Sequence, residues 1–409
     1  MSQKRESEDS LATESRKQKV SKKTVAEEPE PEFMFDVSNG LRRVVPYWHT
    51  YKINAKGRWF KRSLIEVFSE EFKDQTREYY FRAIQTGKVS VNNEKKLPDY
   101  LIRSGDVIRH SMHRHEPPVT SDPIKIVFQD NETLVVDKPG SIPVHPTGRY
   151  QHNTVTGILK SKEYGFTNVF SVNRLDRLTS GILLLALTKE RAAQLSTQLA
   201  DRSVSKTYLC RVRGKFPENT VICTEPILVT SNKLGVNIVS QELGLPCETH
   251  FIFQSYNPDS STSIIQAHPK TGRMHQIRVH LQFLGYPITN DPIYANPEFW
   301  GEALGKGGEG VDMQVVSEKI KAAKVQGISE DGEDEVGGIA VNEGRQGVIP
   351  SSIEGESLDA QEFPCPRCAI RLPDPTMDQR RIYLHAWKYS GDGWAYETDI
   401  PGWATLEKK

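Results

Sequence analysis

A carboxylate lies between two guanidinium groups in the segment NRLDRLTSGILLLA, residues 173–186. Asp176 is flanked by Arg174 and Arg177, and a run of aliphatic residues follows at once. Charged groups beside an apolar interior lose solvation, so they are usually paired or functional, and their pKa values are open to tuning. A structural ion pair that caps a strand is the simpler explanation of this window alone. A functional carboxylate is the alternative that the rest of the sequence must decide.

Two further segments concentrate Lys, Arg, His and Gly. They are DKPGSIPVHPTGRY at residues 137–150 and KTGRMHQIRVH at residues 270–280. A helix over residues 272–284 would place His275, Arg278 and Gln282 together, on a face different from that of its apolar residues. We expect this polar stripe to face away from the core. If the three segments converge, they form a basic cleft that contains one carboxylate.

The elements that must position these groups form a β-rich domain that begins near residue 124. Strands are predicted at IKIVFQD, TLVVDKPG, GILLLAL, TYLCRVRG, ETHFIFQSY, TSIIQAHP and YLHAWKYS. Helices are predicted at residues 189–199 and 272–284. Several strands follow one another directly, so we expect the α+β class with a mixed, largely antiparallel sheet, and not a doubly wound parallel one.

A smaller unit precedes this domain. Apolar spacing predicts helices over residues 63–72 and 77–86, and short strands are predicted at KVSVNN and in LIRSGDVIRH, residues 101–110. This order of two helices, a strand and an sGDvI turn resembles the small αL RNA-binding module that precedes the catalytic domain of many RNA-modifying enzymes. The resemblance implies that residues 41–118 bind RNA.

Composition bounds the class of protein. The 409 residues are 37% hydrophobic and 26% charged, which suits one large domain and a small one. The 53 basic and 53 acidic side chains cancel, so net charge argues neither for nor against a nucleic-acid partner. No segment has the length of a membrane span, and the five scattered cysteines suggest no disulfide framework. We therefore expect an intracellular protein without membrane association.

Two polar stretches favour disorder. Residues 1–32 are rich in Lys, Glu, Ser and Gln, and RKQKVSKK in this arm could address a nucleus. The many acids among the first thirty residues disfavour a mitochondrial presequence, so the predicted location is cytoplasmic or nuclear. Residues 302–362 are acidic and glycine-rich without core-forming periodicity, and they are interpreted as a disordered insertion.

Two groups of residues could bind a metal. His110, His113 and His115 in HSMHRHEPP have no cysteine or carboxylate at zinc-site spacing, so a polar linker is the simpler interpretation. Cys365 and Cys368 in PCPRC form half of a zinc motif, but the other two ligands are not apparent in the sequence. The prediction is therefore no metal, although zinc at the two cysteines stays open.

Three segments carry a specific resemblance. VVDKPGSIPVHP, NRLDRLTSGILLLA and PKTGRMHQIRVHLQFLGYPITNDPIYA resemble, in the same order, the signature segments of the RluA-type pseudouridine synthases. KTYLCRVRG and YLHAWKY match lesser segments. RHEPPVTSDPIKIVFQD, HPTGRY and NDPIYANPEFWG further resemble the eukaryotic branch that modifies transfer RNA at position 32 of the anticodon loop.

The resemblance implies isomerisation of uridine within RNA, without a metal or redox cofactor. Asp176 matches the catalytic aspartate of the family, which either attacks covalently or abstracts a sugar proton, and both routes require an ionised carboxylate. A nearby guanidinium would keep it ionised. Arg278 is the expected partner and Arg273 the alternative.

The remaining site residues are carried over in the same way. Arg174 matches the arginine that fills the gap left by the flipped nucleotide. Tyr208 matches the tyrosine that lies against the flipped uracil. His275 belongs to the same polar stripe as Arg278. Lys138, His145 and Arg149 are assigned to phosphates or to loop geometry.

The resemblance also sets the domain boundaries. We expect an arm over residues 1–40, the αL-like module over 41–118, the catalytic domain over 119–301, the insertion over 302–362, and C-terminal strands over 363–409 that complete the catalytic domain. Family members often have His or Tyr where Asn173 stands and a small hydroxyl residue where Met274 stands. These departures concern the fit of the substrate. RNA, most plausibly transfer RNA, is the expected partner of a monomer.

Two alternatives remain. A base deaminase would use PCPRC together with a His-x-Glu or Cys-x-Glu segment; Cys223-Thr224-Glu225 has the right letters but lies far from Cys365 in the sequence, inside the synthase-like domain. A catalytically inactive RNA-binding protein of the same fold is the second alternative. The intact Asp176 favours an enzyme, because a binder of polyanionic RNA would gain by losing that negative charge.

Overall fold

The computed structural model describes residues 34–72, 75–231, 235–308, 312–325, 365, 368 and 373–405. Most of the expected N-terminal arm, residues 1–33, lies outside these residues. The arm was expected to reach residue 40, and this boundary is wrong because β1 (Phe35–Ser38) pairs with β2 (Leu41–Val44). β7 (Val119–Thr120) completes this three-stranded sheet. The buried side chain of Leu41 explains why the segment is ordered.

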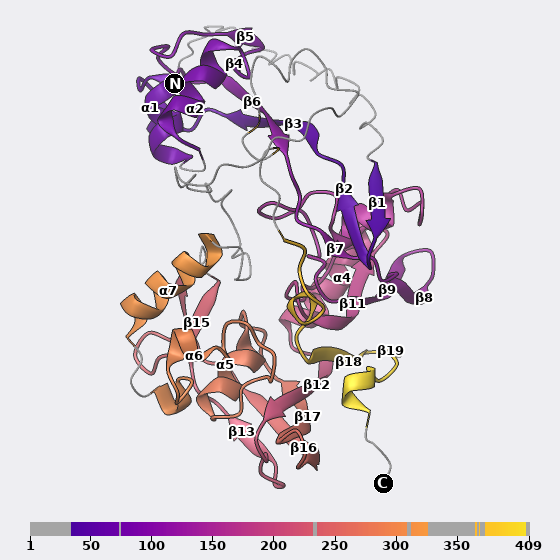
Figure 1. The fold of residues 1–409 in the computed structure, drawn as a ribbon. Helices are drawn as coiled ribbons and strands as arrows, with labels where there is room; N and C mark the ends of the chain where they lie inside the picture. Colours follow the sequence, from indigo (N-terminus) through magenta and orange to yellow (C-terminus); the bar gives the residue numbers. More distant parts are fainter. Residues whose placement is uncertain are drawn as a thin grey trace, which may run out of the picture. The chain divides into compact units, whose positions relative to one another are not determined.

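The expected small unit has its own core. β3 (Tyr47–Asn54), β6 (Val107–Arg114), β4 (Val89–Val91) and β5 (Glu94–Lys95) form a sheet in this order, and α1 (Leu64–Glu71) and α2 (Arg77–Gln85) belong to the same unit (Figure 1). Ser63 and Thr76 accept hydrogen bonds from Glu66 N–H and Tyr79 N–H and so cap the two helices. The two predicted helices and the strands β4 and β6 are confirmed. HSMHRHEPP is not a polar linker, because β6 continues through Arg114.

The larger domain that the sequence predicts is built on a ten-stranded sheet. Its main path runs β13-β16-β17-β12-β18-β11-β9-β8, with β10 paired to β11 and β19 paired to β18. The bounds are β8 (Lys125–Gln129), β9 (Thr133–Lys138), β10 (Phe170–Ser171), β11 (Ser180–Ala186), β12 (Ser205–Arg213), β13 (Val221–Cys223), β16 (Thr249–Asn257), β17 (Thr262–Pro269), β18 (Leu384–Gly391) and β19 (Trp394–Glu397). Among these described strands β11 and β18 pair in parallel, and the other pairs are antiparallel. The predicted mixed, largely antiparallel sheet is confirmed.

Gly181 explains the glycine of the RLDRLTSG segment. Its φ is +110°, and a Cβ built on it would lie 2.2 Å from the carbonyl oxygen of Ala386 on β18. Only glycine permits this conformation and this approach. This close approach lets the C-terminal strand β18 pair with β11 in the sheet. Strand β11 begins directly after the loop that carries Asp176. This is how residues more than 200 positions apart complete one domain.

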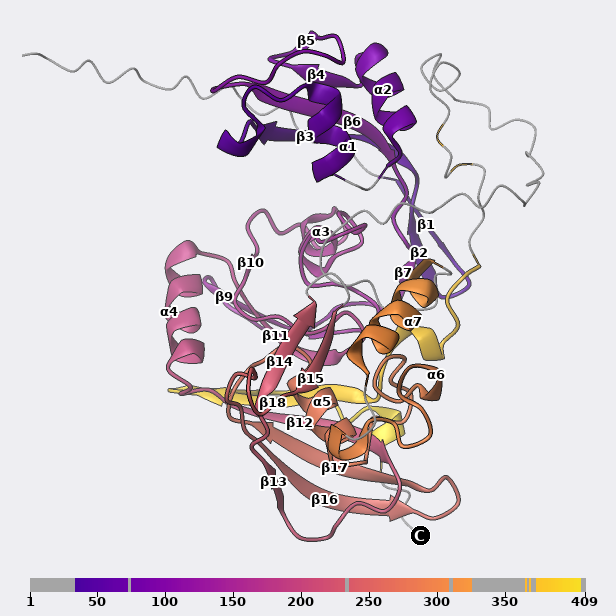
Figure 2. The ribbon, with the colours of Figure 1, turned by 90° about the vertical axis from the view of Figure 1, so that its left-hand side faces the viewer.

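Helices cover this sheet. α4 (Lys189–Ala200) follows β11 as predicted, and α5 (Gln276–Phe283) packs against β16 and β17 (Figure 2). α5 begins later than the predicted residue 272, because His275 has a left-handed φ of 57° and ends a loop. The prediction that its polar stripe faces away from the core is wrong. Arg278 and Gln282 are buried and His275 is partly buried, because the larger domain encloses α5 on both faces.

The expected disordered insertion begins with ordered structure. α6 (Pro297–Trp300) is followed by α7 (Met313–Val325), whose Val316 and Ile320 are buried against Phe299 and Trp300. The i, i+4 spacing of Val316 and Ile320 within a polar segment is a helical signal that the acidic composition obscured. The disorder predicted for this part is therefore wrong. Residues 326–362 of the predicted insertion lie outside the described residues.

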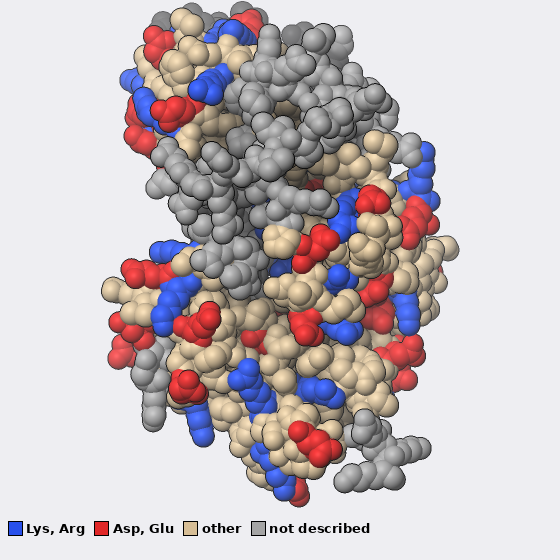
Figure 3. All heavy atoms as spheres, in the orientation of Figure 1, with Lys and Arg blue, Asp and Glu red and all other residues tan. Residues whose placement is uncertain are grey.

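The remaining elements complete the larger domain. They are α3 (Val155–Lys160) and the hairpin of β14 (Ile227–Ser231) and β15 (Val236–Val239). Short 3-10 turns occur at Gly57–Trp59, Lys306–Gly308, Asp378–Arg380 and Gly402–Ala404. No helix among the described residues has both the length and the apolar character needed to cross a bilayer. Lys and Arg side chains are interspersed with Asp and Glu over the visible face in Figure 3, in line with the zero formal net charge.

Candidate active site

A cavity of about 1020 Å³ opens where the predicted segments meet. The loop before β11, strand β12, the loop between β17 and α5, and strand β18 supply its walls. Among the described residues, its lining includes the basic side chains Arg174, Arg202, Lys206, Lys270, Arg273 and Arg278 but a single carboxylate, that of Asp176. A cavity with this charge pattern attracts a polyanion and places one negative oxygen donor inside it.

Asp176 sits in a tight turn between β10 and β11. The Thr179 N–H donates to the Asp176 carbonyl oxygen at 3.1 Å, which closes the turn and directs the side chain into the cavity. The carboxylate is 29% exposed, so a ligand can reach it. Arg278 Nη1 lies 3.4 Å and His275 Nε2 lies 3.7 Å from Asp176 Oδ2. Arg278, which the sequence analysis predicts as the partner of Asp176, therefore lies beside this carboxylate.

Arg278 is itself held by a second carboxylate. Its side chain has no exposed surface, and its Nε and Nη2 donate to Asp291 Oδ2 and Oδ1 at 2.7 and 2.9 Å. The Asp291 Oδ1 atom also accepts from the N–H groups of Ile293 and Tyr294. This bidentate pair fixes the guanidinium plane and leaves Nη1 directed at Asp176. The cation is thus fixed beside Asp176 before any substrate arrives.

His275 is oriented by Tyr294. The buried Tyr294 hydroxyl accepts from the Asn237 N–H at 3.0 Å and lies 3.0 Å from His275 Nδ1. This contact orients the imidazole ring within the cavity wall. Nε2 is the atom that faces Asp176. Burial raises the pKa of Tyr294, which keeps this hydroxyl protonated.

Tyr208 faces the cavity from β12. Its hydroxyl hydrogen-bonds to that of Tyr389 on β18. Burial raises the pKa of Tyr208 to about 12; the hydrogen bond with Tyr389 partly offsets this increase, and the charge of Asp176 adds a smaller increase. The phenol is therefore neutral at physiological pH. It offers an aromatic face and a hydroxyl, but no negative charge, to a ligand in the cavity.

The loop before α5 is fixed by Gln276. Its Oε1 accepts from Thr271 Oγ1 and Arg273 N–H at 2.7 and 3.0 Å, and its Nε2 donates to the Glu248 carbonyl at 2.9 Å. Arg273 also lines the cavity, but its Nε and Nη2 donate to the Pro246 carbonyl at 3.4 Å, whereas Arg278 Nη1 lies 3.4 Å from Asp176 Oδ2. Among the two predicted partners of Asp176, the structure therefore favours Arg278 over Arg273.

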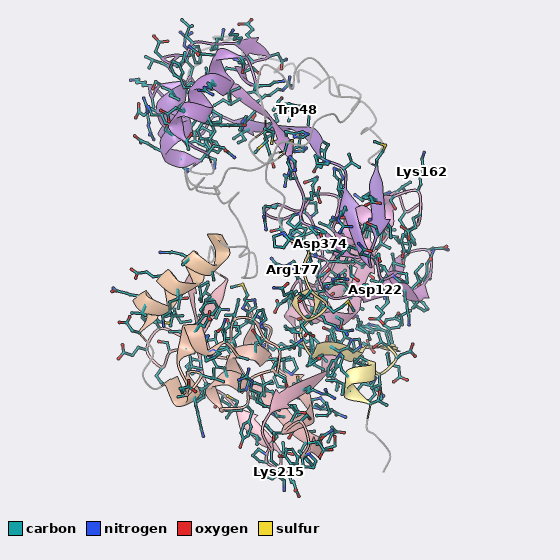
Figure 4. All side chains as sticks on the ribbon, in the orientation of Figure 1. Trp48, Asp122, Lys162, Arg177, Lys215 and Asp374 are labelled. Carbon is teal, nitrogen blue, oxygen red and sulfur yellow. The ribbon has the colours of Figure 1, made fainter. Side chains whose placement is uncertain are left out.

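Arg174 is exposed and lines the cavity on the same loop as Asp176. Arg177, labelled in Figure 4, is not among the described lining residues and lies over the ring of Tyr150 at 6.0 Å. The two guanidinium groups that flank Asp176 in the sequence thus lie in different environments.

Three expected RNA-binding residues do not line this cavity, namely Lys138, His145 and Arg149. The Lys138 side chain is fully buried, and Nζ donates to the carbonyl oxygens of Pro139, Ile142 and Arg177 at 2.8, 2.8 and 3.1 Å. A buried ammonium that binds three carbonyls holds two loops together, so the phosphate role is wrong for Lys138 and the loop-geometry role fits. Burial also lowers the pKa of Lys138 to about 7.

Sequence reasoning missed four residues that shape the site. Asp291, Tyr294 and Gln276 lie in the segment that carries Arg278, and Tyr389 lies in YLHAWKY, so the matched segments contained them. Their contacts depend on the pairing of β18 with β11 and on the loop after α5. The sequence contains no signal for Asp291, because the buried arginine that requires this buried anion becomes apparent only in the fold.

The comparisons with known proteins follow this geometry. Residues 132–283 match the family model described as RNA pseudouridylate synthase. The tRNA pseudouridine(32) synthase, mitochondrial, of Saccharomyces cerevisiae is 41% identical, with 94% of this chain and 81% of that protein covered. Pseudouridylate synthase RPUSD2 of Mus musculus is 39% identical, with 89% and 72% covered. The tRNA pseudouridine(31) synthase of S. cerevisiae is 30% identical, with 90% and 96% covered.

The class of protein follows from these findings. This chain belongs to the RNA pseudouridylate synthase family, and it is an isomerase that acts on RNA. The predicted enzyme class and RluA-type resemblance are confirmed. The deaminase alternative is disfavoured, because Cys223 is buried in the core with Phe216 and Phe251 and, among the described residues, is not grouped with Cys365.

The prediction that disfavoured mitochondria is wrong. The yeast relative that is 41% identical, with 94% of this chain covered, is named as a mitochondrial enzyme. The acidic residues of the first thirty positions were therefore a poor guide to location.

Proposed function

We propose that this enzyme converts uridine 32 in the anticodon loop of transfer RNA to pseudouridine, with Asp176 as the catalytic carboxylate. The observation that carries the proposal is the single carboxylate of a basic cavity, in contact with a buried arginine that Asp291 holds in place. The names of two relatives place their reaction in transfer RNA, at positions 32 and 31.

The reaction is an isomerisation, so its atoms balance without a cofactor. The bond between C1′ and N1 breaks, the uracil rotates, C5 bonds to C1′, and N1 gains a proton while C5 loses one. Asp176 serves either as the nucleophile or as the base that removes a sugar proton, and Arg278 Nη1 lies 3.4 Å from its carboxylate in position to pair with it in both routes. The neutral Tyr208 lies against the uracil ring from the wall of the cavity.

A uracil enters this cavity only after it leaves its stack. Unstacking costs a few kcal/mol, on the order of 2–4, and a planar cation in the vacated space offsets part of that cost. Arg174 is suited to this role because it is exposed at the cavity on the turn that carries Asp176. Asn173 fixes the same turn, since its Oδ1 accepts the Leu184 N–H at 2.9 Å.

The N-terminal unit provides a second contact with RNA in this proposal. On α2 the side chains of Arg77, Phe81 and Arg82 are exposed together, and Phe81 is 43% exposed. Basic and aromatic side chains on one helix suit phosphate contacts and base stacking. Replacement of both arginines by alanine should weaken RNA binding and reduce its salt dependence, whereas Lys215→Ala in the catalytic domain (Figure 4) should not.

The name of the yeast relative also supports a mitochondrial location, which organelle fractionation of the tagged full chain would test. The substrate is tested by deletion of the gene and mapping of lost pseudouridines across cellular RNA. We expect loss at position 32 of transfer RNA, restored by the wild-type gene but not by Asp176→Asn. Unchanged transfer RNA with loss in another RNA would contradict the substrate, and rescue by Asp176→Asn would contradict the role of the carboxylate.

A further inference from the structure

Two halves of a metal motif meet outside the active site. His113 lies on β6 and His115 follows that strand, whereas Cys365 and Cys368 lie on the chain that leads to β18. Cys365 and His115 are separated by 250 residues, yet Cys365 Sγ and His115 Nε2 are 3.5 Å apart. Sequence analysis considered each half alone and found a full ligand set for neither.

Four of the six distances between the donor atoms match the edges of a tetrahedral site for a single ion. Cys368 Sγ is 3.3 Å from His113 Nδ1 and 3.4 Å from His115 Nε2, and the two ring nitrogens are 3.3 Å apart. All four donor atoms lie within 4.8 Å of one another. Tetrahedral zinc, with bonds of about 2.0–2.1 Å to nitrogen and 2.3 Å to sulfur, sets edges of about 3.3 Å between nitrogens and about 3.5 Å between nitrogen and sulfur.

Local structure presents these donors together. Alternate residues of a strand point to one face, so His113 and His115 share a face of the strand and its extension. The Cys368 N–H donates to the Cys365 carbonyl at 3.1 Å, which forms the tight turn of a Cys-x-x-Cys pair. Trp48 of β3, labelled in Figure 4, lies against the His113 ring with centroids 5.4 Å apart. It covers one side of the group with an apolar surface.

We propose that His113, His115, Cys365 and Cys368 bind one zinc ion as a structural Cys₂His₂ site. Two thiolates and two imidazoles with tetrahedral spacing select zinc over the oxygen-preferring cations. Four protein ligands fill its coordination sphere, so no position remains for a reacting water. This distinguishes the site from a deaminase centre, which needs an open position and an adjacent glutamate.

The ion would join two distant parts of the chain. Beyond Cys368, the chain is attached to the N-terminal sheet at Asp374, which accepts from Arg43 at 2.7 Å, and at Arg380, which donates to the Gly40 carbonyl at 2.9 Å. These contacts precede β18, whose Leu384–Gly391 carries Tyr389 into the cavity. A zinc ion coordinated here would close the long loop between His115 and Cys365.

The experiment measures metal in the purified full-length protein, expressed in zinc-supplemented medium and dialysed against metal-free buffer. We expect about one zinc ion per chain by inductively coupled plasma mass spectrometry. Replacement of zinc by Co²⁺ should give the visible absorption of a tetrahedral ion together with thiolate-to-cobalt charge transfer. Both measurements use the unaltered chain, so their outcome does not depend on whether a variant folds. Less than about 0.1 zinc per chain, or a cobalt spectrum without the thiolate band, would overturn the proposal.

Variants then assign the ligands. Cys365→Ser combined with Cys368→Ser, and separately His113→Asn, should lower the zinc content at least tenfold. His49→Asn is the matched control, because His49 lies on β3 beside Trp48 but is not among the four donors. Zinc that persists in the ligand variants, or is lost equally from the control, would show that the metal binds elsewhere.

Discussion

The largest predicted loss of unfolding free energy concerns the buried ion pair of Arg278 and Asp291. In Asp291→Asn the carbonyl oxygen can still accept from the backbone N–H groups that Asp291 Oδ1 now serves. The new amide nitrogen then faces Arg278 Nε, at a position where the carboxylate accepts at 2.7 Å. A donor therefore replaces an acceptor, and the buried guanidinium loses its bidentate counterion.

The magnitude follows from burial. Neither side chain of the pair has exposed surface, so water cannot replace the lost contacts. Removal of one partner from a buried ion pair costs about 3–5 kcal/mol. For a chain of this size each kcal/mol lowers the melting temperature by roughly 2 °C, which gives a decrease of about 6–10 °C. The remaining carboxylate, Asp176, is partly exposed and cannot compensate for this loss.

The assay is urea unfolding of the purified protein, supported by thermal melts. Asp399→Asn is the matched control, because Asp399 is 90% exposed and its carboxylate lies 3.5 Å from Lys125 Nζ. That change should cost less than about 0.5 kcal/mol. The double variant with Asp176→Asn should show a coupling free energy of at least about 0.5 kcal/mol, since both carboxylates share Arg278. A cost for Asp291→Asn equal to that of the control would refute the reasoning.

Three further predictions concern single residues. Arg174→Ala should slow pseudouridine formation more on a structured stem-loop than on an unstacked oligonucleotide, and equal losses in the two rate assays would exclude a role in base flipping. Gly181→Ala should cost at least about 2 kcal/mol of unfolding free energy in urea, because of its φ of +110° and the Ala386 backbone, whereas Gly402→Ala, with no atom within 4 Å, should be nearly neutral. Burial lowers the pKa of His385 from 6.5 to about 4, so between those values the unfolded state binds more protons and stability falls as pH falls. The loss should approach about 3 kcal/mol near pH 4, and His385→Gln should show a smaller decrease than wild type; equal slopes would contradict this.

The sequence predicted much of the sheet and the centre of the site. Strand periodicity located β8, β9, β11, β12, β16, β17 and β18, because alternating or continuously apolar runs determine which faces are buried. The resemblance implied that Asp176, Arg278 and Tyr208 belong to one site, and all three residues line the same cavity. Their local spacing alone left an ion pair as the simpler interpretation of Asp176.

The remaining features depend on contacts between distant segments. Nothing within α5 shows that its polar stripe is buried, since that burial arises from the loop that carries Asp291 and from strand β18. The sequence left Lys138 with two possible roles, a phosphate contact or loop geometry, and only the fold shows that it binds three carbonyls inside the domain. Likewise, His113 and Cys365 are 252 positions apart in sequence, and only the fold brings their two short motifs together.

The most direct test of the central claim is single-turnover pseudouridine formation by Asp176→Asn on a transfer RNA anticodon stem-loop, with RNA binding measured on the same preparation. We predict a loss of at least about 10³-fold in rate, with a dissociation constant within about threefold of wild type. Because the asparagine is nearly isosteric and Asp176 is partly exposed, folding should be retained. A rate within tenfold of wild type, or loss of activity only in proportion to loss of binding, would contradict the assignment of Asp176 as the catalytic carboxylate.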